Sequence, residues 1–502
     1  MMGPTRTGAA TARRALCALL LAAAAAGAAE AQRDYRKDLR LVQSHQGRKR
    51  YTDAVRLTDE MLAYFKESWQ VREVTWLKVD CLVADDRYET ALKVLADLAG
   101  AYADDRKLQA GAARRKAEVL RAMKKPDEAV AALRKLAEDF AADQPDQAAA
   151  ALLAAGDVLC ADLEKPAEGV ALYEKAEEAF GARLPAVGAD AQRRIAAAHE
   201  ARTKDPLRAA EAYRTLADKY AATLDDRARA DAWRKAVECF VKAEKPDEAL
   251  AAARKAEDAL TDAPEKARFA ARQADVLRTA RRPAEARDAC LRLLCAYPLE
   301  QAPCREALAA IVETYRAEEK WADALGAARV AYDAAGDEKS LRDAAQTVAQ
   351  AFLAADGNLL RANEFLTYQR HGPDGPDGKA DTDDDVKVNH LAKIRYPAFG
   401  AAADRQFQAA VDAQDDRFEG RRAKGYLYVY WGRPKDAASQ FLRAFKAAKL
   451  AEVPAAAQEL VLVGIKAHTA SLAGLERVFE YVSYGPKGKS GKEKLPDPFA
   501  GL

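Results

Sequence analysis

The chain has few of the residues that build metal and hydrolytic centres. Among its 502 residues are only seven cysteines and five histidines. No Cys-x-x-Cys pair, no His-x-x-x-His pair on a helix and no Gly-x-Ser-x-Gly turn occurs, and these are the patterns typical of zinc sites and serine hydrolases. The histidines are scattered, at His45, His199, His371, His390 and His468. We therefore expect no cofactor, no catalytic residue and no enzymatic activity.

Glycine and proline are sparse until late in the chain, and the alternating pattern of strands is almost absent. Alanine is abundant, together with Leu, Glu, Lys and Arg, and these residues have strong intrinsic helix preference. The composition therefore predicts an all-α protein.

Long hydrophobic runs are missing after the N-terminus. Three arginines precede the apolar run Ala15 to Ala26, and Ala29-Glu30-Ala31 supplies small residues at cleavage positions, which is typical of a signal peptide over residues 1–31. No later run reaches the roughly 18 apolar residues of a membrane span. We expect an exported protein of the periplasm or cell envelope without a transmembrane segment. The Arg13-Arg14 pair leaves the choice between general secretion and twin-arginine export open.

Neither sign of charge dominates. Lys and Arg number 80, Asp and Glu number 78, and removal of residues 1–31 takes away three Arg and one Glu, which leaves 77 of each sign. Nucleic acids and anionic membranes are bound through a basic excess. The balance therefore argues against both as the main partner.

A turn motif recurs along the chain and sets its architecture. The prolines of these turns step by 40, 40, 40 and 37 residues, in Lys-Pro-Asp-Glu-Ala and closely similar sequences. They are Pro126, Pro166, Pro206, Pro246 and Pro283, and Tyr51, Tyr88, Trp321 and Pro434 occupy the same place in further copies. Proline fits the first position of a helix because its missing N–H would have no partner there. Each motif therefore predicts the start of the second helix of a pair.

The spacing within these helix pairs resembles the tetratricopeptide repeat. Ala117, Pro126, Ala129, Leu133 and Leu136 match its small, aromatic and apolar positions, and a C-terminal copy matches more closely. That copy comprises Gly425, Tyr428, Gly432, Pro434, Ala437, Phe441 and Ala444. The period is longer than in the family, and Pro stands where an aromatic residue is usual. The resemblance implies a right-handed α-solenoid of stacked antiparallel helix hairpins over most of residues 40–450.

A Gly- and Asp-rich segment interrupts the repeats, and residues 368–379 align with residues 481–492. We divide the chain into a signal peptide (1–31), tetratricopeptide-like repeats (32–370), an Asp/Gly-rich loop (371–390), a C-terminal repeat with capping helices (391–484) and a Gly/Lys/Pro-rich tail (485–502). Asp377, Asp381, Asp383 and Asp385 offer oxygen atoms to Ca²⁺, but their spacing departs from the twelve-residue calcium loop. A solvated acidic loop is the alternative. The second loop is rich in lysine, so we expect attraction between the loops, either within one chain or between chains; the second case predicts self-association.

Binding residues are projected from the resemblance, which implies a concave groove lined by the first helix of each pair. Arginines recur at two equivalent groove positions: Arg114, Arg194, Arg234 and Arg422 at one, and Arg278 and Arg316 at the other. They predict binding of carboxylates, although the same arginines could form a polar outer face. Tyr426 and Tyr430 share a helix face with Arg422, which predicts either a binding hot spot or packing against capping helices.

The cysteines divide into two groups. Cys81, Cys160 and Cys239 fall at similar places in first helices, where a small buried residue is expected. Cys295 and Cys304 flank Pro298 and could form a disulfide, since an exported protein permits one.

These features together predict a non-enzymatic scaffold that binds a partner protein or peptide in a tetratricopeptide-like groove. Two alternatives stay open: an enzyme with a site in residues 371–425, and a calcium-dependent surface or adhesion protein.

Overall fold

The computed structural model describes residues 34–335, 338–357, 359–387 and 390–447, together with Glu480 and Lys487. Their secondary structure is helical throughout, and no strand occurs among them. None of their helices is both long and apolar enough to cross a membrane. The predicted signal peptide, the capping helices and nearly all of the second glycine loop lie outside the described residues.

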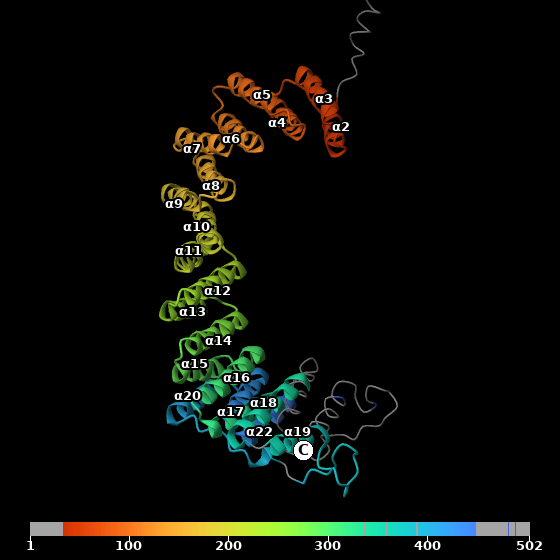
Figure 1. The fold of residues 1–502 in the computed structure, drawn as a ribbon, viewed down its shortest axis with the longest axis vertical. Helices are drawn as coiled ribbons and strands as arrows, with labels where there is room; N and C mark the ends of the chain where they lie inside the picture. Colours follow the sequence, from red (N-terminus) through yellow and green to blue (C-terminus); the bar gives the residue numbers. More distant parts are fainter. Residues whose placement is uncertain are drawn as a thin grey trace, which may run out of the picture. The chain divides into compact units, whose positions relative to one another are not determined.

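The chain forms two compact units, with the division between Thr203 and Lys204. The division falls within the predicted repeat region 32–370. In each unit the helices follow one another as antiparallel hairpins (Figure 1). This arrangement confirms the all-α solenoid of stacked tetratricopeptide-like hairpins.

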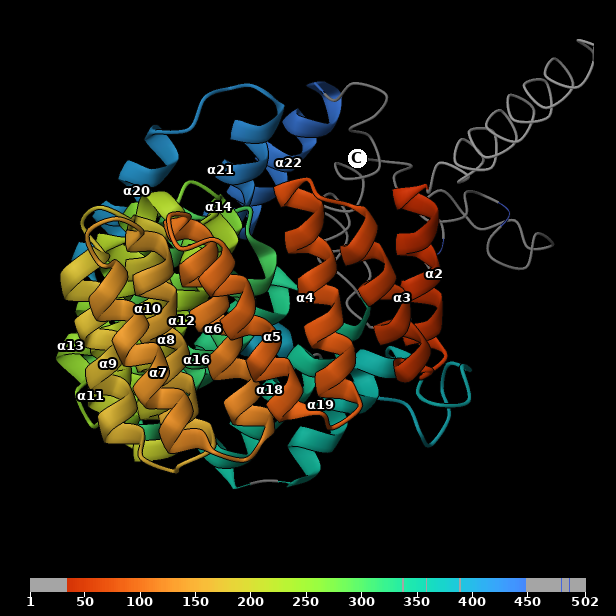
Figure 2. The ribbon, with the colours of Figure 1, turned by 90° about the horizontal axis from the view of Figure 1, so that it is seen from above.

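Unit 1 contains four complete hairpins and one further first helix. Its helices are α2 (Tyr35–Gly47), α3 (Tyr51–Tyr64), α4 (Ser68–Ala84), α5 (Tyr88–Ala101), α6 (Arg106–Ala122), α7 (Pro126–Phe140), α8 (Pro145–Ala161), α9 (Pro166–Phe180), α10 (Pro185–Ala198) and the π-helical turn His199–Thr203. Each helix contacts the next, and first helices also touch each other, as α6 touches α8 and α8 touches α10. Figure 2 shows α2, α3 and α4 side by side at the start of this stack.

Unit 2 continues the alternation and then changes direction. Its helices are α11 (Pro206–Lys219), the 3₁₀ turn Ala221–Thr223, α12 (Asp226–Lys242), α13 (Pro246–Ala259), α14 (Ala263–Thr279), α15 (Pro283–Ala296), α16 (Gln301–Ala317), α17 (Trp321–Ala334), α18 (Glu338–Asp356), α19 (Leu359–His371), the 3₁₀ turn Leu391–Lys393, α20 (Ala401–Asp412), α21 (Phe418–Tyr430) and α22 (Pro434–Ala447). The last three do not extend the stack beyond α19. Instead α20 packs on α15, and α21 packs on α17 and α15.

The turn motif opens the second helix of each pair, as the sequence predicts. Pro126, Pro166, Pro206, Pro246 and Pro283 are the first residues of their helices, and Tyr51, Tyr88, Trp321 and Pro434 begin theirs. The positions matched to the family are buried: Ala117, Ala129, Leu133 and Leu136 are at most 4% exposed. A periodic pattern of small and apolar residues was therefore sufficient to place these hairpins.

One backbone conformation recurs two residues before each of these helix starts. The residue there has positive φ, between 53° and 59° at the eight described turns where it is not glycine. These residues are Lys49, Asp86, Lys124, Glu164, Lys204, Glu244, Arg281 and Glu319, and glycine takes the position only at Gly432, with φ 73°. In the α6–α7 turn, the N–H of Lys125 donates to the carbonyl of Leu120 at 3.0 Å, and Lys124 donates to Arg121 at 2.9 Å. This pair of bonds is a Schellman motif, which satisfies carbonyls at the end of the first helix.

Residues 394–400, which have no regular secondary structure and which we call the strap, return the C-terminal helices to the stack of unit 2. The ring of Tyr396 lies 4.2 Å from the guanidinium carbon of Arg329, and its hydroxyl donates to Asp333 at 2.6 Å. Arg329 also donates to the carbonyl of Ile394. The strap passes close to α17 at Gly326, where a Cβ would lie 2.8 Å from the carbonyl oxygen of Arg395. Glycine is therefore needed at this point of α17.

Candidate protein-binding site

The first helices of unit 1 present one face on which two cavities lie. One cavity is lined by α2 and α4, and the other by α6, α8 and α10 with a single residue of α7. These are consecutive first helices, which the resemblance places along a groove. We name the two hollows the N-terminal cavity and the central cavity.

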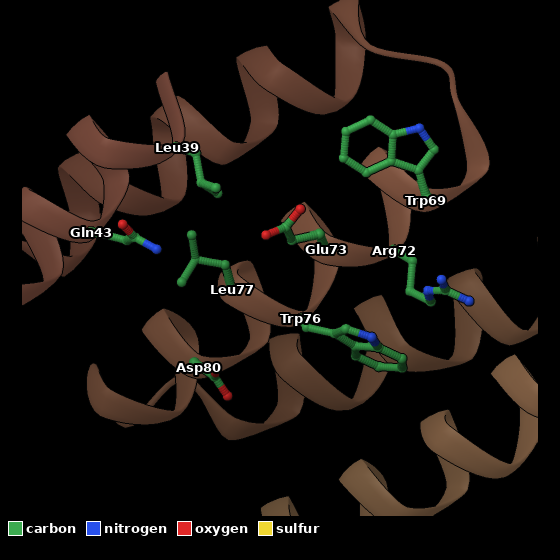
Figure 3. A pocket seen from close by; sticks show the side chains of 8 residues that line it. All are labelled: Leu39, Gln43, Trp69, Arg72, Glu73, Trp76, Leu77 and Asp80. Atoms are coloured by element: carbon green, nitrogen blue, oxygen red, sulfur yellow. The ribbon is translucent and has the colours of Figure 1, made fainter. Parts of the chain in front are cut away.

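The N-terminal cavity has a volume of about 390 Å³ (Figure 3). Its lining combines two tryptophans, two leucines and four polar residues: Leu39, Gln43, Trp69, Arg72, Glu73, Trp76, Leu77 and Asp80. Six of these residues come from one helix, α4, at successive turns of the same side. Because Trp69 is 50% exposed, the rim of the cavity has an uncovered aromatic surface.

Contacts between α2 and α4 fix the acidic part of this cavity. The hydroxyl of Tyr35 donates to Oε2 of Glu73 at 2.7 Å, and its ring meets Trp69 edge-on, with centroids 5.1 Å apart. Burial, with this hydrogen bond to a carboxylate, raises the pKa of Tyr35 well above its usual value. The phenol therefore stays protonated and keeps donating to Glu73.

The other end of the cavity adjoins α6. Asp80 pairs with Arg115 of α6 at 2.9 Å, and burial raises the pKa of this carboxyl group despite the arginine. The ring of Trp76 lies beside Gly111 of α6, where a Cβ would be 3.5 Å from the indole. These contacts hold α4 and α6 together next to the cavity.

The central cavity has a volume of about 300 Å³, with an apolar floor and a charged rim. The floor comprises Ala117, Leu133, Ala150, Leu153, Ala154 and Val158, and the rim comprises Arg114, Glu118, Arg121, Asp157, Asp190 and Arg194. Each sign contributes three charges to the rim. Apolar surface ringed by polar groups is the usual composition of a protein–protein contact.

The structure brings two of the predicted groove arginines, Arg114 and Arg194, to this one cavity. Both already have carboxylate partners: Arg114 pairs with Glu118 at 3.3 Å, and Arg194 pairs with Asp190 at 3.2 Å and also with Asp157. A carboxylate of a binding partner would have to compete with these residues. The rim is therefore a preformed network of ion pairs rather than a row of free cations.

The other predicted arginines lie in unit 2 and are paired within their own helices. Arg278 pairs with Asp275 at 3.2 Å, and Arg316 with Glu313 at 2.8 Å. Arg422 pairs with Glu419 at 2.8 Å, and Arg234 pairs with Asp231 and, at 3.7 Å, with Glu265. Such pairs are typical of solvated helix faces. Each of these four arginines therefore already has a carboxylate partner.

Tyr426 and Tyr430, for which the sequence predicts either a binding hot spot or packing against other helices, are both buried. They are 5% and 0% exposed, so neither ring forms an accessible hot spot. The Tyr430 hydroxyl donates to the carbonyl of Pro298 at 3.1 Å, and the Tyr426 ring meets Phe441 edge-on at 5.1 Å. Burial raises the pKa of Tyr430 well above its usual value. The predicted stripe packs against the turn after α15 and against α22, because α21 folds back onto the stack.

Unit 2 has larger hollows, but they lie where the folded-back helices meet the stack. One of 710 Å³ is bounded by α13, α14, α15 and α20, and one of 790 Å³ adjoins the turn between α20 and α21. The second includes Ala447, the last residue of the continuous described chain. Neither follows the face of first helices that the repeat architecture places along a groove.

The Asp-rich loop is organised by its own hydrogen bonds. The Asp384 carboxylate accepts from the N–H of Asp377 at 2.9 Å and from the hydroxyl of Thr382 at 2.8 Å, and these bonds hold the pKa of Asp384 below its usual range. Asp385 accepts from the N–H of Thr382 at 3.2 Å. Among the described residues no group of three metal-binding side chains is placed to hold an ion, and this applies to the calcium candidates Asp377, Asp381, Asp383 and Asp385.

The cysteines of the described chain are all free and buried. This differs from the disulfide predicted between Cys295 and Cys304, since Cys304 instead donates to the carbonyl of Tyr297 at 3.3 Å. Burial raises the pKa of both thiols to about 12. Cys81, Cys160 and Cys239 lie in first helices, at the small buried positions expected for them.

Comparison with known proteins gives remote likenesses only. No protein-family model and none of the curated proteins match the chain. Among solved structures, it is similar to a structure of Naa15/Naa10 bound to HypK-THB (14% identity, 88% of this chain and 68% of the other, TM-score 0.30). It is also similar to the apo quorum sensor NprR from B. thuringiensis (13% identity, 65% of this chain and 96% of the other, TM-score 0.25). A third similar structure is the P58(IPK) TPR domain (15% identity, 82% of this chain and 99% of the other, TM-score 0.18). With such TM-scores, the fold assignment rests on the helix contacts of the chain itself.

Sequence reasoning missed the N-terminal cavity. Its signal is present: Trp69 and Trp76 are seven residues apart, which places them on one side of α4, with Glu73 between them. Equivalent arginines do not indicate it, because α4 has no arginine at the projected groove position.

Proposed function

We propose that the chain is a non-enzymatic scaffold that holds a partner protein by an extended segment lying on the first-helix face of unit 1. The observation that carries this proposal is the position of the two cavities, which are lined by α2, α4, α6, α8 and α10 in succession. Five first helices therefore contribute to one binding face.

The chemistry of the face suits side chains of a protein segment. Each cavity, at 300 to 390 Å³, accommodates one or two side chains, and the floors offer Ala, Leu and Trp surface for burial. The ion pairs of the rim are already oriented, so that hydrogen bonding to a partner requires little reordering of long side chains. Affinity would come from the apolar floors, and the charged rim would select the segment.

The place of action that we infer is the periplasm or cell envelope, because residues 1–31 have the pattern of an export signal. Cell fractionation, with N-terminal sequencing of the mature chain, tests this inference. We expect the mature protein to begin at Gln32. A chain that retains residues 1–31 in the cytoplasm would contradict it.

Self-association through the two glycine loops is also part of the proposal. The Asp-rich loop and the lysine-rich loop have opposite charge, and Lys487, Lys489, Lys492 and Lys494 supply the positive one. Replacing these four lysines with glutamine should reduce self-association in low salt. Sedimentation velocity of the two proteins would measure it, and identical profiles would contradict the role of the loops.

The groove role can be tested by site-specific photocrosslinking. A photoreactive phenylalanine analogue at Ala150 or Ala154, in the floor of the central cavity, should crosslink a partner in the native cell envelope. The same residue at Ala171, exposed on the second helix α9, serves as the matched control. We expect one partner captured from both floor positions and not from Ala171.

The crosslinked peptide decides between specific binding and chance capture. Mass spectrometry should map both floor positions to one segment of the same protein, and the pair Leu153→Lys and Ala154→Lys should abolish its capture from Ala150. Equal capture from Ala171 would contradict a first-helix groove.

A further inference from the structure

The N-terminal cavity carries an inference about which side chain a partner segment presents. It rests on the proposed function, since it names the chemistry of one contact on the proposed binding face. We infer that this cavity takes a cationic side chain, Lys or Arg, of the partner segment.

The apolar walls fit the stem of such a side chain. Leu39 of α2 and Leu77 of α4 face one another across the cavity (Figure 3), and both are partly buried. Long basic side chains commonly lay their methylene groups along apolar surface while the charged end reaches a polar partner. The pair of leucines therefore provides the surface for the stem.

The carboxylate of Glu73 lies where the cation would end. Figure 3 shows it directed toward Leu39 and Leu77, whereas the guanidinium of Arg72 extends away on the other side. The Tyr35 hydroxyl donates to one of its oxygens, Oε2, at 2.7 Å, which holds the group at the rim of α2 and α4. A carboxylate fixed in this way is a ready acceptor for a guanidinium or ammonium group, because the hydrogen bond is charge-assisted.

The surrounding charges favour a cation over an anion at this point. Asp80 lies two helical turns from Glu73 on the same side of α4, and its pair with Arg115 is shared, because Arg115 also pairs with Glu118 at 3.1 Å. The indole rings of Trp69 and Trp76 add negative faces that attract a cation. Arg72 is the one basic residue of the lining, and it makes no ion pair within the described chain. It is the group that would favour an anionic ligand instead.

The experiment uses the chain labelled with 5-fluorotryptophan, which gives one ¹⁹F signal for each of its five tryptophans. Replacing Trp69 and Trp76 in turn by phenylalanine assigns their signals. The probes are the peptides acetyl-Ala-Leu-Xaa-Leu-Ala-amide, in which Xaa is arginine, citrulline or glutamate. Citrulline matches the shape of arginine without its charge, so the comparison isolates the cation.

We expect the arginine peptide to shift the signals of Trp69 and Trp76 and to leave that of the buried Trp233 of α12 unchanged. Its dissociation constant should be at least five-fold lower than that of the citrulline peptide. Glu73→Gln should remove this preference. Asp97→Asn, which neutralises an exposed carboxylate on the second helix α5, should keep it.

Tyr35→Phe separates the charge of Glu73 from its structural contact. It removes the hydrogen bond and leaves the carboxylate, so the preference for arginine should persist even if the N-terminal hairpin loses stability. Equal affinity for the arginine and citrulline peptides would overturn the inference. So would tightest binding of the glutamate peptide, which would assign the cavity to Arg72, or the absence of any shift at Trp69 and Trp76.

These outcomes are distinct from failure of the proposed function. Crosslinking from Ala150 and Ala154 reports on the central cavity, which shares no residue with the N-terminal one. A partner captured there, with no arginine preference at Glu73, would leave the scaffold standing and remove only the cation contact.

Discussion

The hydroxyl of Tyr430 donates a hydrogen bond to the carbonyl oxygen of Pro298, 3.1 Å away and 132 residues earlier in the chain. This contact joins the last complete hairpin of the described chain to the turn between α15 and α16. Together with the packing of α20 and α21 on α15 and α17, it fixes where the C-terminal helices lie in unit 2.

Tyr430→Phe should therefore destabilise unit 2. The ring still fills its fully buried space, but the Pro298 carbonyl loses its partner, which costs about 1 to 2 kcal/mol of unfolding free energy. Denaturant unfolding followed by circular dichroism measures the change. Tyr428→Phe, on the same helix and partly exposed, is the matched control and should change stability little. An equal loss in both variants would contradict a specific role for the Tyr430 hydroxyl.

The left-handed residue of the repeated turn gives a second prediction. Glu244, with φ 57°, occupies a conformation that costs a side-chain-bearing residue roughly 1 kcal/mol relative to glycine. Glu244→Gly should consequently leave the thermal midpoint unchanged or raise it, because relief of strain offsets the greater entropy of the unfolded chain. Ala251→Gly, exposed within α13, should lower stability by about 1 kcal/mol. Equal destabilisation by both changes would show that the turn is not strained.

Gly425 gives a third prediction, on the packing of α21 against α22. A Cβ at this position would lie 2.3 Å from the ring of Phe441, which is completely buried. Gly425→Ala should cost about 1 to 3 kcal/mol through overpacking. Adding Phe441→Leu should recover part of that loss, so a double-mutant cycle would give a coupling of opposite sign to the single costs. Strict additivity of the two changes would contradict direct packing between them.

The buried cysteines give a fourth prediction. Burial raises the pKa of Cys290, Cys295 and Cys304 to about 12, so at pH 8 only about one thiol in ten thousand is ionised. The native protein should react with a thiol reagent far more slowly than free cysteine, and faster as the pH approaches 12. After denaturation six thiols should react in a chain that lacks residues 1–31. Four would instead reveal the Cys295–Cys304 disulfide that the sequence suggests.

The regular hairpins could be predicted because their determinants are local. A proline such as Pro126 fixes the start of a second helix, and Ala129 and Leu133 fix the buried side of that helix, all within one hairpin. Every copy repeats this pattern of a helix-starting residue followed by buried small and apolar residues. Because the copies recur at a period of about 40 residues, together they predict the hairpins more strongly than any single copy does. Burial of Ala117 and Leu136 followed from the same spacing.

The return of the chain after α19 could not be predicted in this way. Tyr430 contacts Pro298 and Tyr396 contacts Arg329 and Asp333 across long stretches of sequence, and no period relates these positions. Nearest-neighbour stacking predicts that a new hairpin continues the stack, so Tyr426 and Tyr430 were expected at a binding face or an end cap. Gly326 in α17 was the available clue, since a helical glycine permits close approach of another segment of backbone.

For the candidate site, the sequence predicts only a face of the repeats and none of its side-chain contacts. The resemblance places a groove on first helices, and both cavities lie there, but the ion pair of Arg194 with Asp157 joins α10 to α8 and cannot be read from local spacing. The pairs Arg114–Glu118 and Arg194–Asp190 are local, because the partners are four residues apart on one helix. Rotamers and pairing choices between helices are set by tertiary packing. The aromatic rim at Trp69 depends equally on Tyr35, which belongs to the preceding hairpin.

The left-handed residue that recurs in every turn makes the hairpins exchangeable units. Excision of residues 126–165 removes α7 and α8 and joins Lys125 to Pro166. The new junction keeps the left-handed Lys124, followed by Lys125 and by Pro166 at the start of the next helix. Gene duplication or deletion at such junctions can thus change the number of hairpins in steps of one period without inventing a new turn. The number of first helices can then change one at a time, and with it the length of the proposed binding face.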